Sequence, residues 1–236
     1  MPSAFYLFGG TSRILIPHEL SSKSKLLKHL GVSQAELKKI WWFNHRMYSL
    51  FNISKKSGKS RLISAPDHRL KMLQQKIAHS LSSLYNPRHT VHGFVRDRSV
   101  RSNAESHLRR RFILNADIKD FFPTITEARV LGLLESIGID TDVAQIIARI
   151  CTNKGCLPQG APSSPVISNM ICFRLDKALM EFSKRNRLLY TRYADDITLS
   201  SFQPPTALFE GDRPDAGKLQ PEKLSNELVS IFKSNG

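Results

Sequence analysis

The sequence contains few cysteines, and they form no recognisable framework. Three cysteines occur among 236 residues, an odd number that argues against a disulfide scaffold and favours a reduced compartment. Cys151 and Cys156 flank Thr-Asn-Lys-Gly, but no second pair of Cys or His residues stands near them to complete a zinc site. We therefore expect ordinary thiols that are buried or half-buried.

Long apolar runs are also missing. No stretch approaches the ~20 residues that a membrane-spanning helix needs, and Met1 to Phe5 lack the basic region of a secretory signal. We therefore expect neither membrane insertion nor export. Hydrophobic residues still make up 41% of the chain, which suits a globular protein with one large domain or two interleaved ones.

Acidic residues are outnumbered by basic ones. The 35 Lys and Arg residues against 20 Asp and Glu residues give a net charge of +15. Such an excess favours a polyanionic partner, with nucleic acid as the first candidate and an anionic membrane surface as the second. The arginines at 96, 98, 101 and 109–111 predict a solvated basic face for which nucleic acid is a natural ligand.

Two of the acidic residues are adjacent. Asp195 and Asp196 lie between the runs 188–192 and 197–200, which are rich in β-branched and aromatic residues. The pattern predicts a β-hairpin with two carboxylates at its tip. Because adjacent carboxylates repel, a hard cation such as Mg²⁺ would supply the missing positive charge. A solvated acidic turn explains the pair equally well, since Asp is a common turn residue.

A further carboxylate follows a predicted strand upstream. The run Phe112–Asp117 reads as a buried strand that ends in Asp117, 78 residues before Asp195. Such an edge of a sheet is a common place for a metal ligand, but only the fold could bring the two aspartates together. The spacing of Thr124 and Glu127 predicts a capping box for the next helix.

A basic turn joins two other β-like runs. Residues 51–54 and 60–63 flank a turn centred on Gly58 that carries Lys55, Lys56 and Lys59. The pattern predicts a hairpin whose cationic tip could clamp a triphosphate or a nucleic-acid backbone. When the segment is taken alone, a loop kept soluble by its lysines is the simpler explanation.

Apolar residues at helical spacing predict several helices. One begins after Ser33, with Glu36 at capping-box spacing, and another spans 70–84. A rigid turn over 157–165 leads into one long helix that carries Ile167 to Phe182 on one face. Residues 202–221 are rich in Pro and Gly and predict a flexible surface loop, after which Pro221 opens a last helix.

Three elements in order resemble the fingers and palm of reverse transcriptases, from about Ile53 to Ser200. They are the strand ending in Asp117 with two phenylalanines after it, the turn Leu-Pro-Gln-Gly at 157–160, and Tyr-Ala-Asp-Asp at 193–196. The segment 103–107 also resembles the Asn-Ala-x-x-His element of bacterial retron reverse transcriptases. Group II intron enzymes share much of this pattern.

The resemblance implies an α+β right-hand polymerase with an antiparallel palm sheet backed by helices. It places the fingers at about 30–110 and 125–157, and the palm at about 111–124 and 158–236. A thumb is expected to be missing before Gly236, so the chain would be truncated or split, or a second chain or self-association would supply the thumb.

The resemblance also implies a catalytic site with two Mg²⁺ ions, or Mn²⁺ in their place. Asp117, Asp195 and Asp196 would hold the metal, together with the main-chain carbonyl of Ile118. Phe122 would be the steric gate against a ribose 2′-hydroxyl. The nucleotide-binding set would comprise Arg61, Lys59, Lys56, Asp120, Phe121, Phe122 and Gln159. Asn103, His107, Arg109 and Arg110 would contact RNA.

The function implied is that of a retron reverse transcriptase in the cytoplasm of a bacterium. Such an enzyme copies a structured noncoding RNA into DNA from deoxynucleoside triphosphates, primes from an RNA 2′-hydroxyl, and serves antiphage defence with an effector protein. Three alternatives remain open at this point. They are a group II intron-like or standalone defence enzyme, an RNA-binding scaffold with idle carboxylates, and a basic membrane-surface protein.

Overall fold

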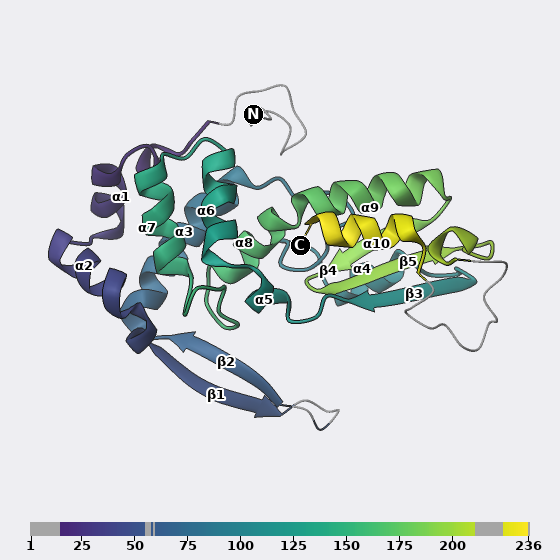
Figure 1. Ribbon diagram of the computed structural model, residues 1–236, viewed down its shortest axis with the longest axis horizontal. Helices are drawn as coiled ribbons and strands as arrows, with labels where there is room; N and C mark the ends of the chain where they lie inside the picture. The colour runs from purple at the N-terminus through teal and green to yellow at the C-terminus, as the bar shows by residue number, and fades with distance from the viewer. Residues whose placement is uncertain (1–14, 55–57, 59, 211–223, 236) are drawn as a thin grey trace. The chain divides into compact units, whose positions relative to one another are not determined.

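The computed structural model describes residues 15–54, 58, 60–210 and 224–235 (Figure 1). The chain divides into two compact units. The first unit comprises Met1–Asn86 and Asp120–Ile171, and the second comprises Pro87–Lys119 and Cys172–Gly236. These boundaries differ from the predicted fingers and palm ranges, because residues 87–110 belong to the second unit and residues 120–124 and 158–171 to the first. The functional names of the two units stay a prediction.

The first unit is built from helices and one β-hairpin. Strand β1 (Tyr48–Ser54) pairs with β2 (Ser60–Pro66) in antiparallel register, which confirms the predicted hairpin. Lys55, Lys56 and Lys59 lie outside the described residues. The other elements are η2 (His18–Leu20), α1 (Lys23–Leu30), α2 (Gln34–Phe43), η3 (Asn44–Met47), α3 (His68–Leu84), α5 (Phe121–Thr124), α6 (Glu127–Ser136), α7 (Thr141–Cys151) and α8 (Ser164–Ile171).

Helix ends in this unit follow the capping chemistry of their sequences. The Ser33 hydroxyl accepts a hydrogen bond from the Glu36 N–H at the start of α2, as predicted. Thr126, and not Thr124, caps α6, because the short helix α5 occupies the chain up to Thr124. The apolar face of α3 is buried as its spacing predicts, through Leu70, Leu73, Ile77 and Leu81.

The second unit is organised around a three-stranded antiparallel sheet. Its strands are β3 (Phe112–Asp117), β4 (Leu189–Tyr193) and β5 (Asp196–Ser201), in the order β3-β5-β4. The remaining elements are α4 (Val100–Glu105), α9 (Phe173–Arg185), η4 (Thr206–Leu208) and α10 (Asn226–Asn235). Side chains of α9 and α10, among them Leu179, Phe182 and Leu228, form a buried cluster with Leu199 and Tyr190 of the sheet.

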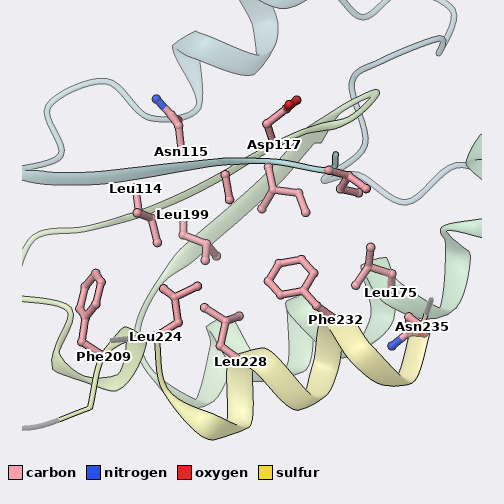
Figure 2. Close-up of a pocket in the computed structure, with 13 residues that line it drawn as sticks. Leu114, Asn115, Asp117, Leu175, Leu199, Phe209, Leu224, Leu228, Phe232 and Asn235 are labelled. Carbon is pink, nitrogen blue, oxygen red and sulfur yellow. The ribbon is translucent and has the colours of Figure 1, made fainter. Parts of the chain in front are cut away.

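The strand predicted to be buried at 112–117 is only half-buried: β3 alternates between half-buried and exposed residues and gives the sheet two unlike faces. Leu114 and Leu199 point toward α10, where an apolar cavity of about 640 Å³ lies between the sheet and Leu228 and Phe232 (Figure 2). Asp117 points away from this cavity (Figure 2), as the two-residue period of a strand requires. The strand ending therefore presents its carboxylate on the face opposite the packed helices.

One prediction about the chain between these elements is wrong, and another holds only in part. The long helix expected after residue 165 is two helices, α8 and α9, with a break at Cys172. The apolar spacing of three and four residues continues across the break, so the pattern could not reveal it. In the described part of the expected surface loop, residues 202–210, most residues are exposed, but η4 interrupts the loop and Leu208 and Phe209 are buried. The predicted helix start at Pro221 lies outside the described residues, and α10 begins at Asn226.

Across the described residues, no helix combines the length and the apolar character that crossing a membrane requires.

Candidate functional site

The sheet of the second unit brings two distant aspartates opposite each other. Asp117 at the end of β3 is the register partner of Asp196 at the start of β5. Directly opposed residues of an antiparallel pair project to the same face, with Cβ atoms roughly 5 Å apart. Both residues are exposed. Pairing of strands that lie far apart in the sequence has thus placed two carboxylates on one face.

The third aspartate lies in the turn beside this pair. Only Ala194 and Asp195 separate β4 from β5, which confirms the predicted hairpin. Ala194 adopts a left-handed conformation, with φ of 57°, and the Ile118 N–H donates to the Asp195 carbonyl over 3.1 Å. Asp117, Asp195 and Asp196 therefore lie together at one end of the sheet.

The donors at this end suit a hard divalent cation in chemical type. Carboxylate and carbonyl oxygens are the ligands that Mg²⁺ prefers, and two like charges directly opposed on a sheet are destabilising without a counter-charge. Within the described ranges, however, no three His, Cys, Asp or Glu side chains converge closely enough to hold a metal ion. The backbone thus gathers the three aspartates, while their side chains are not arranged around one point.

A fully buried ion pair between Arg192 and Asp176 is hydrogen-bonded to the turn that carries Asp195. The Arg192 guanidinium donates through Nε and Nη2 to the two oxygens of Asp176, over 2.7 and 2.8 Å, and through Nη1 to the Ala194 carbonyl over 2.9 Å. The Tyr190 hydroxyl donates to Asp176 Oδ1 over 2.6 Å. Burial would lower the pKa of Arg192, but the adjacent Asp176 carboxylate raises it well above its ordinary value. Arg192 is therefore a permanent cation.

The segment Thr90–Gly93 lies against the same turn. The Arg192 N–H donates to the Thr90 carbonyl over 2.9 Å, and the His92 N–H donates to the Arg192 carbonyl over 2.8 Å. A Cβ atom on Gly93 would lie 2.2 Å from the backbone nitrogen of Ala194. Only glycine leaves room for so close an approach of two backbones.

His107 is buried against the neighbouring strands β4 and β5. Its Nδ1 contacts the Ser200 hydroxyl at 2.6 Å and its Nε2 contacts the Thr191 hydroxyl at 2.7 Å. Burial lowers the pKa of His107, and the nearby charges of Arg110 and His92 lower it further. Both ring nitrogens are therefore engaged inside the protein, and a contact with RNA through the ring would have to replace one of these bonds.

The other residues predicted to contact RNA lie close to His107 in the sequence. Asn103 is half-buried in α4, and its Oδ1 has no hydrogen-bond partner among the described residues. Arg109 is exposed, with a left-handed φ of 63°. The Arg110 guanidinium stacks 4.1 Å from the centre of the exposed Phe202 ring. Their RNA-binding role stays a prediction.

The predicted nucleotide-binding residues that the structure describes lie in the first unit. The Ser64 N–H of β2 donates to the Gln159 carbonyl over 2.8 Å. Gly160 has φ of 119°, and a Cβ there would lie 2.9 Å from Ile63 Cγ2. The Gln159 turn is therefore packed on β2, the strand that carries the exposed Arg61.

Residues 120–122, which follow β3, comprise one aspartate and two phenylalanines that belong to the predicted nucleotide-binding set. Phe121 is buried, so its ring belongs to the core of the first unit. Phe122 is half-buried, and the centres of the two rings lie 5.2 Å apart. Asp120 is exposed in a left-handed conformation, and its carbonyl accepts from the Thr124 N–H. The nucleotide-binding role of Asp120 stays a prediction.

Sequence reasoning missed Asp176, Arg192 and Gly93. Asp176 had a visible signal, because a carboxylate stands beside Leu175 and Leu179 on an otherwise apolar helix face. Arg192 lies directly before the tyrosine of the hairpin, but its burial could not be read from the sequence. The close approach of Gly93 depends entirely on the fold.

Comparisons with known proteins identify relatives of the chain by sequence. Residues 53–208 match the family model described as reverse transcriptase (RNA-dependent DNA polymerase). The chain is 34% identical over 203 residues to the retron Ec86 reverse transcriptase of Escherichia coli, covering 85% of this chain and 63% of that protein. It is 39% identical over 173 residues to the retron Mx65 reverse transcriptase of Myxococcus xanthus, covering 66% of this chain and 40% of that protein.

A more distant relative is the group II intron-encoded protein LtrA of Lactococcus lactis subsp. cremoris. It is 24% identical over 180 residues, which cover 66% of this chain and 30% of that protein. The chain thus spans less than two thirds of the length of each of these three relatives.

Proposed function

Because the chain belongs to the reverse transcriptase family and is of the retron type, we propose that it is an RNA-directed DNA polymerase. The observation that carries the proposal is the register of β3 with β5, which pairs Asp117 with Asp196 beside the turn at Asp195. This pairing lies inside the region that matches the family model. A simple acidic turn would not require a second strand to deliver a carboxylate opposite it.

We assign the second unit, with its antiparallel sheet and backing helices, to the palm of a right-hand polymerase. The first unit, with the β1–β2 hairpin, corresponds to the fingers. In this assignment the carboxylates belong to the palm, whereas Arg61 and Gln159 belong to the fingers. Arg61 lies on β2, and Ser64 of the same strand donates to the Gln159 carbonyl.

The three aspartates would hold two Mg²⁺ ions, or Mn²⁺ in their place, with the Ile118 carbonyl as an added ligand. Bound there, the metal would supply activation of the primer hydroxyl and neutralisation of charge on the triphosphate. The chain contributes the fixed oxygen donors: β3 and β5 hold Asp117 and Asp196 in register, and the Ile118 N–H holds the Asp195 carbonyl.

The substrates would be deoxynucleoside triphosphates and an RNA template. Arg61 would donate to the triphosphate, because a guanidinium matches phosphate in geometry and charge, and the half-buried Phe122 would exclude a ribose 2′-hydroxyl. In the retron role, the template would be a structured noncoding RNA, and an effector protein would couple synthesis to antiphage defence. The net charge of +15 supports a nucleic-acid partner.

Incorporation of labelled deoxynucleotide on a primed RNA template tests the proposal. The parent chain is compared with the Asp195→Asn/Asp196→Asn double variant and with Asp97→Asn, a control whose side chain is 88% exposed. We expect Mg²⁺-dependent incorporation by the parent and the control and none by the double variant. Equal incorporation by all three would refute the assignment.

The mode of priming tests the retron role separately. If synthesis starts on a hydroxyl of the RNA template itself, the DNA remains attached to RNA after heat denaturation and is shortened by ribonuclease. Product that forms only on an added DNA primer would instead favour a group II intron-like enzyme.

A further inference from the structure

The contacts of Arg192 point to a role beyond holding the core together. Asp176, Tyr190 and Arg192 are at most 2% exposed. A buried ion pair is an expensive way to join a helix to a strand, because desolvation of the two charges offsets most of their attraction. Apolar side chains of similar volume would hold α9 against β4 at least as well. The pair therefore calls for an explanation other than stability.

A hydrogen bond that the guanidinium makes outside the ion pair supplies that explanation. Arg192 Nη1 donates to the carbonyl of Ala194, the residue directly before Asp195. The Arg192 side chain also donates to both oxygens of Asp176. Asp176 lies in the first turn of α9, where the helix dipole favours a carboxylate. An apolar side chain could not donate to this carbonyl.

The turn is thus held at two successive carbonyls. Arg192 binds the Ala194 carbonyl from within the sheet, and the Ile118 N–H binds the Asp195 carbonyl from the end of β3. The left-handed conformation of Ala194 is uncommon for a residue with a side chain. A turn that departs from the preferred backbone conformations persists where surrounding contacts determine it.

We propose that Arg192, fixed by Asp176, is a positioning residue that sets the orientation of the Ala194–Asp195 peptide and thereby of the Asp195 carboxylate. The proposal rests on the polymerase function only for its effect on catalysis. The geometric part, that Arg192 orders the turn, holds for the protein without any substrate.

Two variants separate positioning from packing. Arg192→Lys keeps the charge beside Asp176 but replaces the planar fork by a single ammonium, which cannot reproduce both the bidentate pair and the bond to Ala194. Asp176→Asn keeps the shape of the side chain that accepts from Arg192 and removes its negative charge. Tyr190→Phe is the matched control, because it removes a hydrogen bond to Asp176 in the same cluster and leaves the bonds of Arg192 in place.

Amide hydrogen exchange at Ile118 reports the order of the turn, since this N–H is bonded to the Asp195 carbonyl. We expect exchange to be faster by about tenfold or more in Arg192→Lys and Asp176→Asn, and close to the parent rate in Tyr190→Phe. In the polymerase assay, the two variants should lower kcat by about tenfold or more with little change in the KM for nucleotide.

The outcomes distinguish this proposal from the proposed function. If the parent chain makes no DNA, the polymerase assignment fails, while the exchange comparison still decides whether Arg192 orders the turn. Parent-like exchange at Ile118 in folded Arg192→Lys and Asp176→Asn would overturn the positioning role. Failure of both variants to fold, with Tyr190→Phe folded, would also overturn it, because the pair would then serve stability alone.

Discussion

Replacing Gly93 by alanine should damage the acidic turn more than it damages the fold. The added Cβ would lie 2.2 Å from the Ala194 nitrogen and 2.9 Å from the Tyr193 carbonyl carbon, whereas ordinary contact begins at 3.4 Å. Both neighbours are backbone atoms and cannot rotate away. The two segments must therefore separate by about 1 Å, directly beside Asp195.

The substitution should lower both the free energy of unfolding and the rate of catalysis. Overpacking of this kind costs about 1–3 kcal/mol, which a domain with a typical stability of about 5–15 kcal/mol survives. A displacement of about 1 Å at a reacting group can lower a rate about 100-fold. We therefore expect Gly93→Ala to remain folded at 25 °C, to unfold at a lower urea concentration, and to lose about 100-fold in kcat.

Gly132→Ala is the matched control for this substitution. Gly132 lies within α6, and a Cβ there would meet nothing within 4 Å, so alanine should raise stability by about 0.5–1 kcal/mol through its helix propensity. Urea unfolding and single-nucleotide incorporation are measured on both variants. A Gly93→Ala protein with parent-like kcat would refute the argument that this close approach positions the turn.

Three further predictions concern other parts of the site. Burial is the main cause that lowers the pKa of His107 from its ordinary 6.5. The unfolded chain therefore binds the proton more readily than the folded protein does. The urea midpoint should be constant above about pH 6.5 and fall as the pH drops below it. His107→Gln should make that dependence shallower without abolishing it, because burial also lowers the pKa of His92; an unchanged slope would remove His107 as a source. Phe122→Ala should admit ribonucleotides in a competition assay, and unchanged sugar selection would take the gate role from it. Arg61→Ala should raise the KM for nucleotide more than the Kd for RNA, whereas the reverse pattern would move Arg61 to the template path.

Local features of the site were predictable because they depend on local chemistry. The β-branched and aromatic runs on both sides of Asp195 and Asp196 predicted the hairpin. The apolar run that ends in a carboxylate predicted the strand ending in Asp117, although not that alternate residues of this strand are exposed. The capping of α2 by Ser33 likewise follows from side chains three residues apart.

Features that depend on the tertiary fold were not predictable in the same way. The pairing of Asp117 with Asp196 is a matter of register between strands that lie far apart in the sequence. The burial of Phe121 and of both ring nitrogens of His107 likewise arises only when distant segments pack. The contact of Arg192 with Asp176 depends on where α9 begins, and the apolar pattern across Cys172 concealed that start.

The proposed function requires Asp117, Asp195 and Asp196 to act as one catalytic group. DNA synthesis on a primed RNA template is measured for the three single Asn variants, together with the Kd of each for the same RNA. We expect each variant to lose synthesis while its Kd stays close to that of the parent, because Asn keeps the shape and removes the anionic oxygen ligand. Parent-like synthesis by any one of the three would remove that residue from the group and refute the proposed mechanism.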